Sequence, residues 1–199
     1  GLIVRTDLAP GPLTRWADLW DPRLAGKVQV WDIQRLLMGI ALKSLGYSIN
    51  SENPAELAAV EERLQALKDH ARGAGYDPAA AEAALASDEA VAMYGWAGDF
   101  RRLRARGLPV AYVLPPEGSI LWGDNLVIPA NSPNKYTAEV FINFLLRPEI
   151  TAQFINEIYY ATSNEAAHPF IKPEIRDDPV IFPPVEDLQR AEVILPLGP

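Results

Sequence analysis

The chain has 199 residues, of which 49% are hydrophobic and 22% charged, a formal net charge of −8 and no cysteine. This composition is that of a globular protein with one large or two small domains, and without cysteine there are no disulfides, catalytic thiolates or cysteine-bound metals. The acidic balance argues against a nucleic-acid surface. No apolar run approaches the ~20 residues that span a bilayer, and the start lacks a signal-peptide pattern. We therefore expect a soluble piece, cytoplasmic or already processed, whose signal sequence is absent from this chain.

Strand-like and helix-like segments alternate along the first 116 residues. The clearest helix covers 54–71, because Leu57, Val60, Leu64 and Leu67 recur at helical spacing. This alternation predicts an α/β sheet with helices on its faces. The expected strands are 2–4, 28–32, 91–98 (ending in a glycine turn) and 109–116, and the expected helices are a short one from Thr14 to Asp21-Pro22, then 35–46, 54–71, 78–87 and 99–107.

The second part of the chain has a different pattern. The apolar run 126–129 resembles a buried strand, and 137–158 predicts two helices separated at Arg147-Pro148. From Tyr159 onward prolines are frequent and we expect turns.

Catalytic motifs are missing from the sequence. No serine lies in a nucleophile elbow, no glycine-rich phosphate loop is present, and the paired carboxylates resemble solvated surface. The two histidines, His70 at the tail of the helix 54–71 and His168 before a proline, have no metal-ligand spacing. The basic run 101–106 fits a solvated helix face or a contact with a partner protein. We expect no catalytic residue, no metal and no cofactor.

Two tryptophan–aspartate pairs follow predicted strands. Trp96 and Asp99 follow the strand that begins at 91, and Trp122 and Asp124 follow the next one. Asp99 could also be a helix N-cap and Trp96 a core residue. An organic ammonium ligand, however, needs a carboxylate for its charge and aromatic faces along its alkyl chain, and open α/β sheets bind ligands at the carboxyl ends of strands. The repeated pairing therefore favours a site for a small cation.

Several stretches in collinear order resemble one protein family, the bacterial periplasmic polyamine-binding proteins of ABC importers. They cover nearly the whole chain, and PEGxxxWxD followed by IPAN and FLLRP is the most specific part. The stretches are WADLWDP (16–22), LKSLGYS (42–48), GWAGD (95–99), PPEGSILWGDNLVIPANSPNK (115–135), INFLLRPEI (142–150), YYATSNEAA (159–167) and IRDDPVIFPP (175–184).

The resemblance implies a periplasmic-binding-protein-like (type II) α/β fold in which two lobes close over a ligand. It implies domains at 1–121, the second lobe with an incoming crossover strand, and at 122–199, the hinge return and the C-terminal part of the first lobe. It implies a non-catalytic receptor for putrescine- or spermidine-like cations that delivers ligand to membrane subunits of an importer. The implied location is the periplasm or outside the cell, with a lipid anchor in the parent protein as one alternative. The implied ligand-binding residues are Trp96, Asp99, Trp122, Asp124, Tyr160 and Asp32.

Two departures from the family pattern bear on these expectations. Leu36, preceded by Arg35, stands where the family carries a carboxylate for the far amine, so another amino compound or an anionic solute stays open beside a polyamine. An α/β enzyme acting on an amine is a further alternative. The first half of lobe one is also missing from the chain, so we expect apolar groups such as Phe141, Phe144 and Leu145 to be exposed, and the chain to self-associate or bind a complementary fragment.

Overall fold

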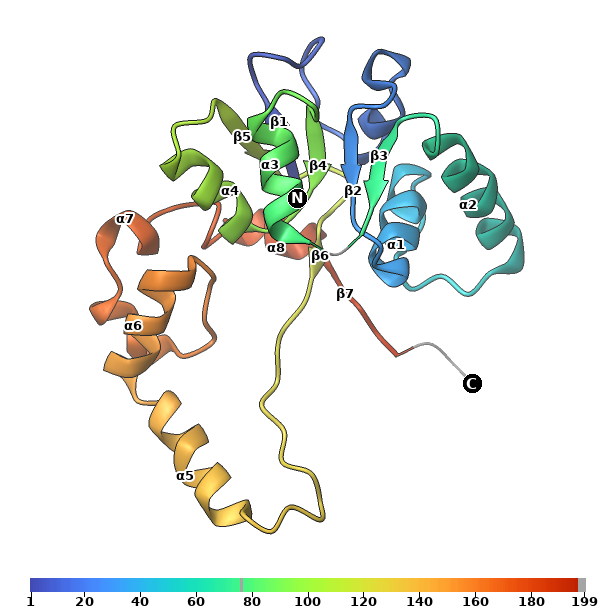
Figure 1. Cartoon of the computed structure of the whole chain (residues 1–199). Coiled ribbons are helices and arrows are strands. Elements are labelled where there is room, and N and C mark those ends of the chain that lie inside the picture. Colours follow the sequence, from blue (N-terminus) through green and yellow to red (C-terminus); the bar gives the residue numbers. More distant parts are fainter. Residues whose placement is uncertain (76, 197–199) are drawn as a thin grey trace. The chain divides into compact units, whose positions relative to one another are not determined.

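The computed structural model describes residues 1–75 and 77–196, which form two compact units (Figure 1). Unit 1 comprises Gly1–Leu121 and the C-terminal segment from Val185, and unit 2 comprises Trp122–Pro184. The sequence predicts domains at 1–121 and 122–199, so the two divisions differ in where they place the segment from Val185. In the structure this segment contributes a strand that pairs within unit 1.

Unit 1 is built on a five-stranded sheet with the order β3-β2-β4-β1-β5. β1 is antiparallel to both of its neighbours, whereas β2 is parallel to β3 and to β4. Four strands therefore point the same way, so the carboxyl ends of β2 and β4 lie next to each other at one edge. The strands are β1 (Leu2–Arg5), β2 (Val28–Val30), β3 (Ala71–Ala74), β4 (Ala92–Tyr94) and β5 (Val110–Val113).

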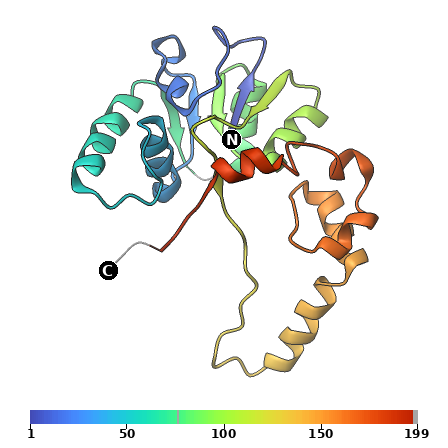
Figure 2. The same ribbon diagram turned by 180° about the vertical axis from the view of Figure 1, so that it is seen from behind.

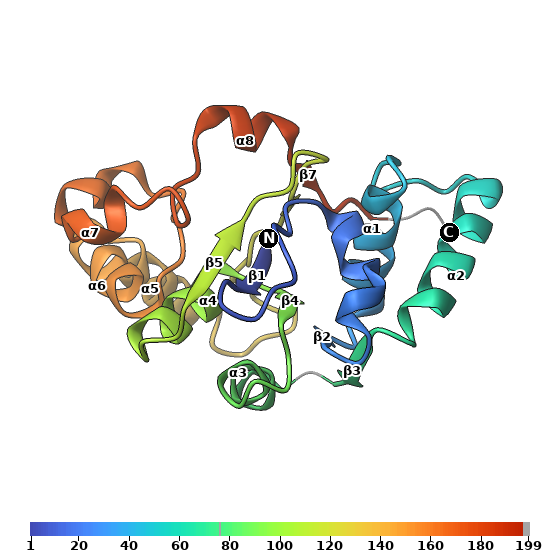
Figure 3. The same cartoon turned by 90° about the horizontal axis from the view of Figure 1, so that it is seen from above.

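Four α-helices and two short 3-10 turns accompany this sheet. Figure 3 shows α1 beside α2, and α4 beside β5. Two of these helices begin with a proline behind a capping side chain: Asn53 accepts from the amide of Ala55 at 2.9 Å, and Asp77 caps α3. The helices are α1 (Gln34–Ser44), α2 (Pro54–Leu67), α3 (Pro78–Ala86) and α4 (Ala97–Ala105), and the turns are η1 (Trp16–Trp20) and η2 (Pro22–Leu24).

The helix predicted over 54–71 is too long, and a strand was missed behind it. α2 ends at Leu67, and Ala71 already pairs with Val28 in the parallel β2–β3 ladder. The backbone carbonyl of His70 accepts from the amide of Val28 at 3.0 Å, so this histidine leads into the sheet and is not on a helix tail. Short, polar strands such as β3 carry no alternating apolar pattern, and only the ladder identifies them.

The C-terminal segment is fastened to unit 1 at several points. α8 (Val185–Arg190) leads to β7 (Glu192–Val193), which pairs in parallel with β6 (Ile120–Leu121). The buried ammonium of Lys43 forms an ion pair with Glu192. Gly118 has φ +94°, and a Cβ placed on it would lie 1.9 Å from the carbonyl oxygen of Arg190. A glycine is therefore required where the two chain segments meet.

Unit 2 contains α5 (Lys135–Leu145), α6 (Pro148–Ile158), the 3-10 turn η3 (Glu165–Phe170) and α7 (Pro173–Arg176). The helix break at Arg147-Pro148 is confirmed, and the turn-rich tail also contains η3, α7 and α8. A small core joins α6 to the segment that follows it, and its buried side chains are Ala152, Ile155, Ala167, Ile171, Ile175 and Ile181.

Two apolar stretches of unit 2 are not covered within the part of the chain that the structure describes. The buried strand predicted at 126–129 is wrong: Leu126 and Val127 are 61% and 81% exposed, and residues 122–129 form an extended trace outside any strand, followed by turns before α5 (Figure 2). α5 has no buried residue, and Phe141 and Phe144 are exposed as expected, whereas Leu145 is half-buried. An apolar pattern alone does not bury a segment; a partner surface must also be present.

Candidate functional site

Two tryptophans meet at the edge of unit 1 where β2 and β4 end. The ring centroids of Trp31 and Trp96 are 5.7 Å apart, with an interplanar angle of 48°. Trp31 is held by a reciprocal pair of hydrogen bonds, because its indole Nε1 donates to the carbonyl of Tyr94 at 2.8 Å and the Tyr94 hydroxyl donates to the carbonyl of Trp31 at 2.8 Å. Burial raises the pKa of Tyr94 far above its usual value, so this hydroxyl remains a donor. Trp31 is not among the predicted site residues, although it lies within the strand predicted at 28–32.

Asp32 follows Trp31 at the same edge and is exposed to solvent. Its negative charge contributes to the raised pKa of Tyr94, after burial, which places its carboxylate near the Trp31–Tyr94 pair. The edge therefore combines aromatic faces with an accessible carboxylate.

Asp99 lies in the first turn of α4, and its carboxylate is buried. One oxygen accepts from the backbone amide of Trp96 at 3.1 Å, and the other forms an ion pair with Arg102. The helix starts at Ala97, earlier than predicted, with Trp96 as its N-cap, so Asp99 is not itself the N-cap. Burial raises the pKa of Asp99, and the Trp96 amide and Arg102 oppose that rise. The N-cap role considered for Asp99 is therefore wrong; its carboxylate, three residues into the turn, instead accepts from the Trp96 amide and fixes the backbone there.

A second aromatic pair lies in unit 2. Trp122 immediately follows β6 along the chain and is 44% exposed. Its ring centroid is 5.7 Å from that of Tyr160 in an edge-to-face arrangement of 76°. Tyr160 is brought there by the left-handed residue Tyr159 (φ 61°), which ends α6. Asp124 is exposed two residues beyond Trp122.

The predicted site residues thus fall into two groups, one in each unit, and each contains a pair of aromatic rings in contact. Trp96, Asp99 and Asp32 belong to unit 1, joined there by Trp31, and Trp122, Tyr160 and Asp124 belong to unit 2. Both groups consist of an aromatic pair and an exposed carboxylate, which is the combination that an organic ammonium ligand needs.

Arg35 makes its contacts inside unit 1. Its guanidinium donates to the carbonyl of Ile49 at 2.5 Å and to Oδ1 of Asn50 at 2.8 Å, both in the connection between α1 and α2. Neighbouring Leu36 is half-buried at the start of α1. Arg35 therefore braces a loop, and these contacts give no support to a binding role for an anion.

The histidines give no sign of catalysis or metal binding. Nδ1 of His70 is buried without a hydrogen-bond partner among the described groups, and the ring of His168 contacts that of Phe182 edge-to-face with centroids 5.1 Å apart. Among residues 1–75 and 77–196, no group of three His, Cys, Asp or Glu side chains is arranged to hold a metal ion. Within the same described part of the chain, every helix is too short or too polar to cross a bilayer.

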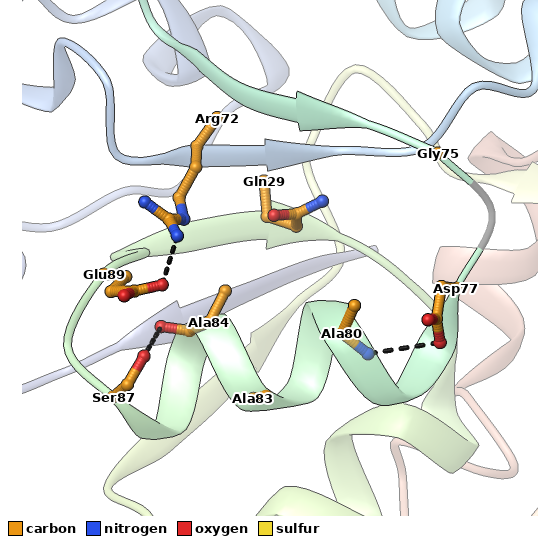
Figure 4. A pocket seen from close by; sticks show the side chains of 9 residues that line it. All are labelled: Gln29, Arg72, Gly75, Asp77, Ala80, Ala83, Ala84, Ser87 and Glu89. Atoms are coloured by element: carbon orange, nitrogen blue, oxygen red, sulfur yellow. Dashed lines mark hydrogen bonds and ion pairs between the residues drawn. The ribbon is translucent and has the colours of Figure 1, made fainter.

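A separate hollow of about 770 Å³ opens between α3 and strands β2 and β3 (Figure 4). Its floor is alanine-rich, and an ion pair between Arg72 and Glu89 closes one end. None of the predicted site residues lines it. The hollow follows from the small side chains of α3, and its lining residues are Gln29, Arg72, Gly75, Asp77, Ala80, Ala83, Ala84, Ser87 and Glu89.

Comparison with known proteins places this chain in a family. Residues 1–183 match the family model described as bacterial extracellular solute-binding protein. The spermidine/putrescine-binding periplasmic protein of Escherichia coli is 36% identical over 183 residues, covering 92% of this chain and 52% of the relative. The chain thus spans about half the length of the curated relatives it matches.

Solved structures agree with the sequence comparison. The spermidine/putrescine substrate-binding protein PotD from Streptococcus pneumoniae superimposes on the whole of this chain with a TM-score of 0.83 at 28% identity, over 61% of its own chain. The Tp0655 lipoprotein of Treponema pallidum covers 98% of this chain with a TM-score of 0.84 at 25% identity, over 60% of its own chain. The predicted α/β, periplasmic-binding-protein-like fold is therefore confirmed, and the chain belongs to the bacterial extracellular solute-binding protein family.

Proposed function

We propose that this chain is part of a receptor for polyamine-like cations that supplies an ABC importer. The matched relatives from E. coli and S. pneumoniae are named for spermidine and putrescine, which supports this ligand class. The observation that carries the proposal is one aromatic pair in each unit, with an exposed carboxylate one or two residues beyond a tryptophan of that pair along the chain. A diamine needs one such arrangement for each of its ammonium groups.

The ligand-binding residues in this proposal are Trp96, Asp99, Asp32, Trp122, Asp124 and Tyr160. Unit 1 corresponds to the second lobe, and unit 2, Trp122–Pro184, to the hinge return and part of the first lobe. The ligand binds between lobes in the whole receptor, and its differential contacts shift the equilibrium from an open to a closed form. The importer then recognises the closed form. The periplasm is the proposed compartment, in keeping with the names of the relatives.

We further propose that the exposed apolar surface of unit 2, formed by α5 and residues 126–127, is covered in the functional receptor. Phe141 is 56% exposed, and Leu126 and Val127 are more exposed still. Exposed apolar side chains grouped on a helix promote association. In this proposal a complementary polypeptide, which supplies the part of the fold outside these residues, covers the apolar surface. In its absence a second copy of the chain covers it.

The alternative ligands are another amino compound and an anionic solute. The first is compatible with both aromatic–carboxylate groups. The second would need a cationic side chain available to the ligand, and Arg35 is already bonded to Ile49 and Asn50. We propose that the receptor has no enzymatic activity; an α/β enzyme acting on an amine remains the competing class, and turnover of an amine would establish it.

The experiment is calorimetric titration of the intact protein with putrescine, spermidine, amino acids and phosphonates. We expect amines to bind and phosphonates not to bind, and Asp124→Asn to weaken putrescine binding at least about tenfold, because a charged hydrogen bond is lost. Asp69→Asn removes a similarly exposed carboxylate outside both groups and serves as the matched control. Amine binding that is unchanged by Asp124→Asn would remove that residue from the site, and phosphonate binding without amine binding would reject the proposed ligand class.

A further inference from the structure

The buried carboxylate of Asp99 is shared between the backbone and an arginine. Its Oδ2 accepts from the Trp96 amide at 3.1 Å, and its Oδ1 pairs with the guanidinium of Arg102. The Asp99 side chain is 5% exposed, whereas that of Arg102 is 42% exposed. Arg102 thus lies on the more solvent-accessible side of this carboxylate, where an incoming cation would have to approach.

Arg102 has a second carboxylate within reach. Its Nε donates to Oε1 of Glu82 on α3 at 2.6 Å, and Arg106 lies 3.7 Å from the other oxygen of Glu82. Two guanidinium groups therefore face two carboxylates, so the negative charge of Asp99 is already compensated within unit 1. A ligand ammonium gains little from a carboxylate whose charge is already balanced.

Asp124 differs in this respect. Its side chain is exposed, whereas Asp99 is buried under an arginine. The two aspartates proposed for the same ligand thus differ in what the ligand ammonium must displace. It displaces water at Asp124, and it must displace the guanidinium of Arg102 at Asp99.

We infer that Arg102 is a specificity-determining residue of the proposed amine site, because its guanidinium competes with the ligand ammonium for the Asp99 carboxylate. Glu82 sets the outcome of this competition, since it can hold Arg102 when the ligand displaces it from Asp99. The Trp96 amide bond to the other oxygen is kept throughout. This inference rests on the proposed function. It means that the Glu82–Arg102 pair controls how tightly one end of the ligand is bound.

Two substitutions with opposite predicted effects test the competition, with putrescine as the probe in calorimetry of the intact protein. Arg102→Gln removes the competitor, and we expect putrescine to bind about three- to tenfold more tightly. Glu82→Gln removes the alternative partner of Arg102, and we expect binding about threefold weaker. Matched controls for the change in net charge are Arg176→Gln and Glu89→Gln, whose side chains are exposed and belong to other ion pairs.

Thermal unfolding shows whether each variant is folded. If Arg102→Gln does not fold, Glu82→Gln still decides, because it leaves both Arg102 and Asp99 in place. Wild-type binding of putrescine with variant affinities within twofold of the controls would overturn this inference and leave the proposed function standing. Weaker binding by a folded Arg102→Gln protein would also overturn it. Failure of the wild type to bind any amine would reject the proposed function and this inference with it.

Discussion

The two aromatic groups of this protein are supported in different ways. In unit 1, Trp31 is buried and held by the reciprocal bonds with Tyr94, and Trp96 is fixed through Asp99. In unit 2, Trp122 is 44% exposed and its ring contacts that of Tyr160 edge-to-face. A preorganised group loses less freedom when a ligand binds. We therefore expect unit 1 to provide a rigid half of the site, and unit 2 to become rigid only when its apolar surface is covered.

The largest expected effect concerns the core of unit 1. Leu103 on α4 is fully buried, so Leu103→Ala should lower the free energy of unfolding by about 2–5 kcal/mol through lost packing and a cavity. Leu126→Ala in unit 2 removes the same atoms from a side chain that is 61% exposed. It should change the free energy of unfolding by less than about 0.5 kcal/mol. Urea unfolding monitored by circular dichroism measures both, and equal costs would abolish the contrast between the units.

The next effect concerns the junction of the C-terminal segment with unit 1. Gly118→Ala places a Cβ 1.9 Å from the Arg190 carbonyl at a residue with φ +94°, and we expect a loss of about 3 kcal/mol in the free energy of unfolding. Gly26→Ala has a similar positive φ of +69° but no neighbour within 4 Å, and should cost only about 1 kcal/mol. Similar costs for both alanines would show that the segment is not held close to Gly118.

The support of the Trp31–Trp96 group is tested by Tyr94→Phe. This change removes the hydroxyl that donates to the Trp31 carbonyl and leaves that buried oxygen without this partner, which should cost about 1–2 kcal/mol of unfolding free energy. Near-ultraviolet circular dichroism of the tryptophans should change as well. Tyr136→Phe, at a tyrosine that is 79% exposed in unit 2, is the control and should change neither measurement. An unaltered tryptophan spectrum in Tyr94→Phe would argue against rigid support of this group.

A pH dependence is expected from Glu192. Burial raises its pKa, but hydrogen bonds from Lys43 and Ser48 outweigh burial, so the folded pKa lies below the ordinary value of 4.5. A depressed folded pKa contributes stability above the unfolded pKa, and this contribution is lost as the pH falls through the folded pKa. The stability advantage of the wild type over Glu192→Gln should therefore be present at pH 7 and shrink below pH ~4.5. Glu186→Gln, on exposed α8, should show no such trend. An advantage independent of pH would exclude a charged Lys43–Glu192 contact.

The smallest effect is expected on α5. Phe141→Ala should change the unfolding free energy of the chain by less than about 0.5 kcal/mol, because the ring is 56% exposed. It should also reduce self-association, measured by light scattering at increasing concentration, because it removes part of the apolar surface. A cost above about 2 kcal/mol in monomeric protein would mean that α5 is packed, and the contrast between the units would then disappear.

Much of the fold could be predicted from local pattern. Helix 54–67 follows from its apolar spacing and from Asn53-Pro54, and the break at Arg147-Pro148 follows from the restriction that proline places on the preceding residue. The strand Ala71–Ala74 could not be predicted in this way, because it has a polar, glycine-containing sequence and depends on its ladder with β2. The exposed run at 126–129 shows the converse failure, in which a strong apolar pattern has no covering surface among the described residues.

For the candidate site, the sequence determined the kinds of side chains that follow the strands: Trp96 with Asp99, and Trp122 with Asp124. These follow from local order along the chain, because a side chain next to a strand end stays there in any α/β sheet. Only the tertiary structure brought Trp31 against Trp96, buried Asp99 and set Arg102 between it and Glu82. The Trp31–Trp96 and Glu82–Arg102 contacts join residues that follow neighbouring strands or lie on separate helices, whereas Asp99 and Arg102 lie three residues apart on α4. Their energies depend on burial and distance, which the order of residues along the chain does not specify.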